Sequence, residues 1–148
     1  MLRIGKSELD ELRRHGEETY PCESCGVLLG EVSGDGNKVV KTVVRCNNAR
    51  LDSPHNRYHI DPRELLRIQR EARDRQQDIL GFYHSHPDHP AHWSSTDLDE
   101  AHWIGSSYVI TSVHQGRAQD TNSFQLAGDE DTKHFEDEPI TVFGDLVK

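Results

Sequence analysis

The chain has 148 residues, which is enough for one domain with a hydrophobic core of its own. Its mean hydropathy is −0.81, no apolar run approaches the length of a membrane span, and the first residues show no secretory signal, so the cytoplasm is the expected location. The formal net charge is −9, from 26 acidic and 17 basic residues, which argues against a nucleic-acid partner because phosphate neutralisation needs a basic face.

Short apolar and β-branched runs recur along the chain and predict strands. In chain order these are residues 2–4, 27–32, 38–46, 79–86, 107–113, 123–127 and 140–143. The run at 27–32 stays largely apolar, as expected of a central strand, and the Gly-rich stretch after it predicts a hairpin turn.

Cap residues predict helices between these strands. The first helix is expected to be capped by Ser7 and to end near Gly16. The second has Asp61 as its candidate N-cap and Pro62 at its first position, and we expect it to end near Gln77.

Two histidines stand at the end of the strand predicted at residues 79–86. Because alternate side chains of an extended backbone share a face, His84 and His86 point the same way and could bind one ion. Eight residues after His86, Ser94 opens a hydroxyl cluster that predicts a helix start, and Asp97 falls in the first turn. That carboxylate could be a third ligand, leaving a fourth tetrahedral position for water, as catalytic zinc requires.

A single acid, Glu23, stands just ahead of the apolar run at 27–32. Acids at strand starts are usually solvated, so Glu23 gains a functional interpretation only from the downstream motif. A carboxylate beside a metal-activated water could act as general base and then as general acid. The nearby pair Cys22 and Cys25 has the spacing of zinc ligands, but three cysteines cannot build a four-cysteine site, so Cys25 is interpreted as a core residue and Cys22 has no assigned role.

Together, His84, His86, Ser94 and Asp97 match the H-x-H-x7-S-x2-D signature of the JAMM (MPN-plus) metalloproteases, which this chain resembles. The segment around Glu23 is similar to the P-x-E-x-C-G-x-L-x-G segment in which that family carries its catalytic glutamate. The likeness is strongest to the minimal bacterial and archaeal members. It implies an α/β fold of the cytidine-deaminase-like type, a mixed β-sheet with helices on both faces, in one MPN domain that spans the chain.

The resemblance also implies a chemistry for these residues. His84, His86 and Asp97 would hold one catalytic zinc ion, Glu23 would carry the proton, and Ser94 would donate a hydrogen bond to the developing oxyanion. The implied reaction is hydrolysis of a peptide or isopeptide bond after the C-terminal Gly-Gly of a ubiquitin-like or sulfur-carrier protein. The alternative is a non-catalytic MPN scaffold that binds such a partner, although scaffold members typically lack the metal ligands.

Three further segments are expected at the surface. A substrate tail would lie extended against a rim made by residues 47–56 and by the loop 88–93, which carries two histidines outside the signature, His89 and His92. Residues 128–139 are rich in acids and are expected to form a solvated loop, with a docking surface for a basic partner as the alternative.

Overall fold

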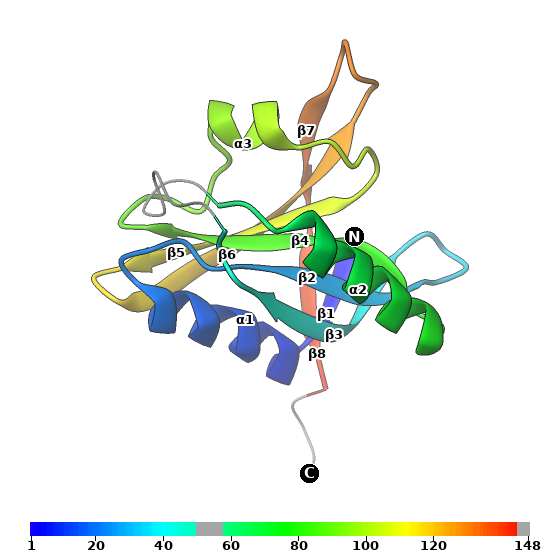
Figure 1. The fold of residues 1–148 in the computed structure, drawn as a ribbon, viewed down its shortest axis with the longest axis horizontal. Helices are drawn as coiled ribbons and strands as arrows, with labels where there is room; N and C mark the ends of the chain where they lie inside the picture. Colours follow the sequence, from blue (N-terminus) through cyan, green and yellow to red (C-terminus); the bar gives the residue numbers. More distant parts are fainter. Residues whose placement is uncertain (50–57, 145–148) are drawn as a thin grey trace.

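The computed structural model describes residues 1–49 and 58–144, which form a sheet flanked by short helices (Figure 1). The strands are β1 (Leu2–Gly5), β2 (Cys25–Val32), β3 (Lys38–Cys46), β4 (Asp78–Pro87), β5 (Ser107–His114), β6 (Arg117–Ala127), β7 (His134–Glu138) and β8 (Ile140–Phe143). The helices are α1 (Lys6–Thr19), α2 (Pro62–Asp74) and α3 (Ser95–Glu100). None of these helices is long and apolar enough to cross a membrane.

The sheet runs in the order β7, β6, β5, β4, β2, β3, β1, β8. Strand β1 is parallel to β3 and to β8, and β4 is parallel to β5, whereas the remaining pairs are antiparallel. The predicted mixed sheet of an α/β fold is therefore confirmed.

Strand β4 lies near the middle of the sheet, between β2 and β5. Because β2 is antiparallel to β4, with Cys25 opposite His84, the chain that enters β2 lies beside the end of β4. All residues of β4 from Leu80 to Pro87 are buried. The sheet order thus brings the segment of Glu23 next to the two histidines, although about 60 positions separate them in the chain.

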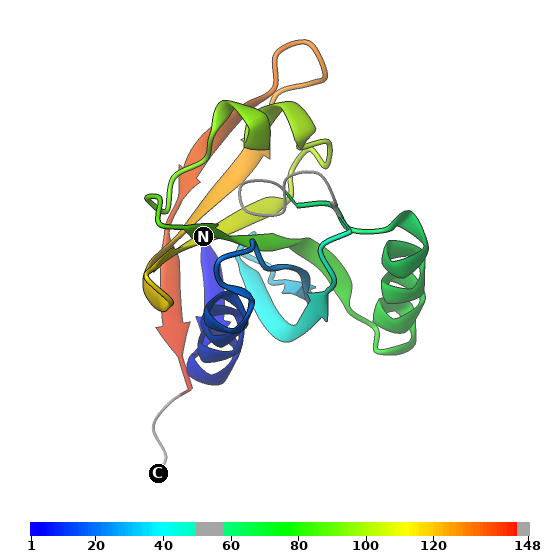
Figure 2. The same cartoon turned by 60° about the vertical axis from the view of Figure 1, so that its left-hand side comes forward.

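Side chains of β2 alternate between two core clusters. Leu28 packs in one cluster with Leu12 of α1, and the neighbouring Val27 packs in the other with Ile68 of α2. All four side chains are almost completely buried, and burying a side chain of this size contributes about 1.5–3 kcal/mol. Helices α1 and α2 lie apart from each other in both views of the fold (Figures 1 and 2).

The start and the end of α1 differ from the prediction. Gly5 is the N-cap and makes no side-chain hydrogen bond, while Ser7 lies inside the first turn, so the prediction of Ser7 as the cap was wrong. The helix also continues past Gly16, which is buried against the sheet. A Cβ on Gly16 would lie 3.0 Å from Cγ2 of Val113 and 3.2 Å from Cβ of Ser85, so this glycine allows close helix–sheet packing rather than ending the helix.

The second helix has its predicted start. The Asp61 side chain accepts a hydrogen bond from the Arg63 N–H at 2.8 Å, with Pro62 at the first helical position. The helix ends at Asp74, slightly before the predicted Gln77.

Strand β6 is longer than the predicted run at 123–127, because its polar first half also pairs with β5, and α1 contacts this half. Arg13 of α1 donates to the carbonyl groups of Ala118 and Gln119, and Glu17 accepts the Ala118 N–H. These partners lie about 100 positions away in the sequence, and local hydrophobicity does not reveal them.

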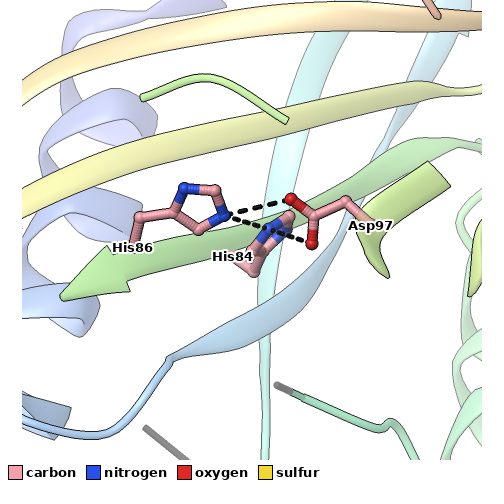
Figure 3. Close-up of side chains that lie close together, drawn as sticks. All are labelled: His84, His86 and Asp97. Carbon is pink, nitrogen blue, oxygen red and sulfur yellow. Dashed lines mark hydrogen bonds and ion pairs between the residues drawn. The ribbon is translucent and has the colours of Figure 1, made fainter. Parts of the chain in front are cut away.

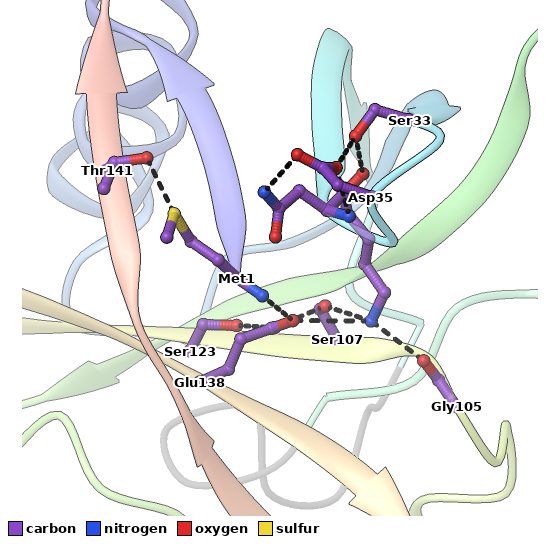
Figure 4. A network of polar contacts seen from close by, with 10 residues as sticks. Met1, Ser33, Asp35, Gly105, Ser107, Ser123, Glu138 and Thr141 are labelled. Atoms are coloured by element: carbon purple, nitrogen blue, oxygen red, sulfur yellow. Dashed lines mark hydrogen bonds and ion pairs between the residues drawn. The ribbon is translucent and has the colours of Figure 1, made fainter.

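The prediction of a solvated loop over residues 128–139 was wrong for its second half, which forms β7. Glu138, at the end of β7, is buried and accepts hydrogen bonds from the hydroxyls of Ser107 at 2.6 Å and Ser123 at 2.7 Å (Figure 4). The Lys38 ammonium lies 3.6 Å from the same carboxylate. An acid with this set of donors can be buried, which composition alone did not indicate.

The predicted edge strand at 140–143 is confirmed as β8, which pairs with β1 at one end of the sheet. Strand β7 pairs with β6 at the other end, and only Pro139 separates β7 from β8 in the chain. One short segment therefore borders both ends of the sheet.

Candidate metal centre

The three side chains predicted as metal ligands lie close together at the end of β4. The Nε2 atoms of His84 and His86 lie 3.2 Å apart, and each faces one carboxylate oxygen of Asp97, at 3.2 Å from His84 and 3.1 Å from His86 (Figure 3). Both histidines are buried. His84, His86 and Asp97 thus offer three ligand atoms within 4.8 Å of one another, which a metal ion could bind.

The first turn of α3 sets the orientation of Asp97. Ser94 is the N-cap, as predicted: its Oγ accepts the Asp97 N–H at 3.1 Å, and its own N–H donates to Oδ2 of Asp97 at 2.9 Å. This reciprocal capping box satisfies two backbone N–H groups and turns the Asp97 carboxylate back toward β4. Ser94 therefore has a structural contact with a proposed ligand, in addition to any contact with substrate.

Hydrogen bonds around the ring fix which nitrogen of His86 faces the centre. Nδ1 lies 2.9 Å from the Pro90 carbonyl oxygen, which can only accept, so Nδ1 donates to it and the ring is turned with Nε2 toward His84 and Asp97. The loop that presents this carbonyl is itself anchored, because the Asn122 side chain donates to the Ala91 carbonyl oxygen at 2.9 Å.

His84 lies under an aromatic ring. Tyr58 stacks on the imidazole with 4.6 Å between ring centroids and 25° between planes. Burial lowers the pKa of His84 and so favours the neutral form, which is the form that binds metals. Burial alone would raise the pKa of Asp97, but hydrogen bonds from His84, His86 and the Ser94 N–H hold it well below its usual value.

Glu23 lies beside this group and is 3% exposed. It lines a pocket of about 370 Å³ together with His86 and Ser94. Its Oε1 has no hydrogen-bond partner within the described part of the chain. Burial, with smaller contributions from Asp97 and Glu100, raises the pKa of Glu23 to about 9.

The residues present fit a divalent cation such as zinc. Two imidazole nitrogens and a carboxylate are a donor set typical of catalytic zinc sites. A buried carboxyl oxygen without a hydrogen-bond partner is costly unless a cation or a substrate group compensates it. The arrangement around Glu23 therefore favours a nearby positive charge.

The other site predictions have mixed outcomes. His89 and His92 line the same pocket as Glu23 but are not part of the three-residue group. The predicted rim at 47–56 lies mostly outside the described residues. Cys25 is buried, as expected of a core residue.

Sequence reasoning gave no role to several residues that contact the site. Tyr58 had no predicted role, and the carbonyl of Pro90 carries no side-chain signal. Asn48, Ser85 and Asn122 bind backbone groups of distant segments, and such partners are visible only in the folded chain.

These features define an α/β protein with a candidate metal centre at the end of a central strand. The family profile described as prokaryotic homologs of the JAB domain matches residues 5–127, and the chain belongs to this JAMM-type family.

Two curated relatives and one solved structure are similar over most of their length. A desampylase of Haloferax volcanii is 37% identical over 115 residues, 75% of this chain and 80% of that protein. A probable TtuB-protein conjugate cleaving protease of Thermus thermophilus is 31% identical over 118 residues, 80% of this chain and 74% of that protein. The solution structure of a Desulfitobacterium hafniense protein matches with a TM-score of 0.81 and 31% identity, covering 99% of this chain and 95% of that one.

Proposed function

We propose that this protein is a zinc-dependent peptidase or isopeptidase that hydrolyses the bond after the C-terminal Gly-Gly of a ubiquitin-like or sulfur-carrier protein. The observation that carries the proposal is the buried group of His84, His86 and Asp97 beside Glu23, whose Oε1 has no hydrogen-bond partner among the described residues. The names of the two relatives, a desampylase and a conjugate-cleaving protease, support the substrate class.

Each site residue has a place in this mechanism. Bound by His84, His86 and Asp97, one zinc ion would polarise the scissile carbonyl, acidify the attacking water and favour the ionised form of Glu23. Glu23 accepts the proton of the water and passes it to the leaving amine. Ser94 already accepts the Asp97 N–H through its Oγ, so its own hydrogen can be donated to the oxyanion that develops at the carbonyl.

We further propose the finer fold type, cytidine-deaminase-like with helices on both faces, in one domain. The division of the core supports it, since Leu28 packs with α1 and Val27 with α2, and alternate residues of a strand face opposite sides.

The alternative function is that of a non-catalytic scaffold. A scaffold does not need a buried, oriented metal-ligand set, and the capping box that turns Asp97 toward the histidines favours the enzyme.

The test is to incubate the zinc-loaded protein with conjugates of ubiquitin-like sulfur carriers, with Glu23→Gln as the matched control. We expect cleavage after the Gly-Gly end by the wild type and a turnover lowered by about 1,000-fold or more, but still measurable, in the variant. Removing the metal with a chelator should stop the reaction, and adding zinc back should restore it. Binding of conjugates without cleavage by the wild type would support the scaffold instead.

A further inference from the structure

The peptide unit between Glu23 and Ser24 is held at both of its polar groups by side chains. Its carbonyl oxygen, on Glu23, accepts a hydrogen bond from Nδ2 of Asn48 at 3.3 Å. Its N–H, on Ser24, donates to Oγ of Ser85 at 2.8 Å. Asn48 lies just after β3 and Ser85 belongs to β4, so this peptide unit is bound from both sides of β2.

The position of Glu23 explains why such support is needed. Strand β2 begins only at Cys25, so Glu23 lies before the regular ladder. At the other end of the side chain, Oε1 of Glu23 finds no hydrogen-bond partner in the described residues. The hydrogen bonds at the Glu23–Ser24 peptide unit therefore help to set the direction of the carboxyl group.

Ser85 is well placed to transmit the geometry of the metal centre. It lies between His84 and His86 in β4, is 1% exposed, and donates its own N–H to the Ser24 carbonyl oxygen at 3.2 Å. Its side chain and its backbone thus both bind Ser24, which fixes the distance from the glutamate segment to the strand that carries the histidines.

Asn48 also connects the same peptide unit to the segment of Tyr58 and His59. Its Oδ1 accepts the His59 N–H at 3.1 Å, while the Ala49 N–H donates to the His59 carbonyl oxygen at 2.7 Å. His59 follows Tyr58, whose ring stacks on His84. One side chain therefore holds both the backbone of Glu23 and the segment that covers a proposed ligand.

We propose that Asn48 and Ser85 are positioning residues for Glu23, which align its carboxyl group with the reacting centre without binding metal or substrate. This inference rests on the proposed function. Misplacement of a catalytic group by about 1 Å can cost about 100-fold in rate. Loss of either side-chain contact should therefore lower kcat about 10-fold to 100-fold, with KM and zinc content unchanged.

The experiment compares Ser85→Ala with a matched control, Ser112→Ala. Ser112 in β5 is also buried, pairs with His86 in the sheet, and its Oγ accepts the backbone N–H of Asp120 in the neighbouring strand at 3.2 Å, but among the described residues no hydrogen bond joins it to Glu23 or Ser24. We expect Ser85→Ala to lose at least tenfold in kcat and Ser112→Ala less than threefold. Asn48→Ala provides a second variant and should behave as Ser85→Ala does.

Two readouts separate positioning from general damage. Zinc affinity and stoichiometry, measured by titration and elemental analysis, should match the wild type in Ser85→Ala and in Asn48→Ala. In a Glu23→Gln background, adding Ser85→Ala should cause no further loss of the residual rate, because the group it positions is already gone.

The outcomes are distinguishable. If the wild type cleaves no conjugate, the proposed function fails and the positioning role fails with it. If the wild type cleaves and Ser85→Ala keeps the kcat of Ser112→Ala, the positioning role alone is overturned. Loss of zinc in Ser85→Ala, or a further rate loss in the Glu23→Gln background, would also overturn it.

Discussion

The two buried glutamates of the described chain, Glu23 and Glu138, lie in opposite kinds of surroundings. Glu138 accepts hydrogen bonds from Ser107 and Ser123 and has the Lys38 ammonium 3.6 Å away. Glu23 is buried to a similar degree, but its Oε1 has no hydrogen-bond partner in residues 1–49 and 58–144. A carboxylate that stabilises the fold has its hydrogen-bond partners within the protein. A carboxylate that takes part in catalysis leaves an oxygen available to a ligand.

The largest expected effect comes from removing the cation that we propose beside Glu23. His84→Ala should abolish stoichiometric zinc binding and lower turnover by more than about 1,000-fold, because two ligands cannot hold a catalytic ion. Elemental analysis and cleavage rates check this. The control is the double change His89→Ala and His92→Ala, which should keep its zinc. Equal zinc loss in both variants would show that the metal site includes the loop 88–93.

A smaller effect is expected from replacing Glu138, the glutamate whose partners lie within the protein. Glu138→Gln leaves the Lys38 ammonium, which is 12% exposed, without its carboxylate. We expect the free energy of unfolding to fall by about 2–4 kcal/mol, with kcat per folded molecule within about twofold of the wild type. Denaturant unfolding and cleavage kinetics measure the two effects. A large loss of kcat with unchanged stability would place Glu138 in the catalytic machinery.

The third prediction concerns pH in the metal-free protein. The folded-state pKa of Glu23 is raised from 4.5 to about 9, so between these values the folded protein holds a proton that the unfolded chain releases. Stability should therefore fall as pH rises through this window, by at most about 1.4 kcal/mol per pH unit. Glu23→Gln, which has no proton to lose, should show a shallower slope. Identical slopes would mean that the surroundings of Glu23 do not disfavour its charge.

The smallest expected effect lies in the loop that orients His86. Asn122→Ala removes the anchor on the Ala91 carbonyl, next to the Pro90 carbonyl that binds Nδ1 of His86. We expect zinc affinity to fall about tenfold, as is typical when a group that supports a metal ligand is lost. A competitive zinc titration measures this. Unchanged affinity would show that the loop keeps the Pro90 carbonyl in place without Asn122.

The two glutamates also show what the sequence could and could not predict. The residues proposed as metal ligands could be brought together from the sequence because their geometry is local: two lie two positions apart on a strand, and the third lies in the first turn of a capped helix. The role of Glu138 was missed because its partners come from three other strands, and an acid-rich stretch otherwise resembles a loop. The contacts of Asn48 and Ser85 with the glutamate segment were missed for the same reason, since they depend on the order of strands in the sheet.

The central claim is that Glu23 performs chemistry and neither holds the metal nor stabilises the fold. Glu23→Gln keeps the shape of the side chain and removes the base, so one preparation of this variant tests the claim when zinc stoichiometry, unfolding free energy and turnover are measured together. We predict one zinc per chain, a stability at least equal to that of the metal-free wild type at neutral pH, and turnover lowered by about 1,000-fold or more. Stoichiometric loss of zinc, or turnover close to that of the wild type, would contradict the account.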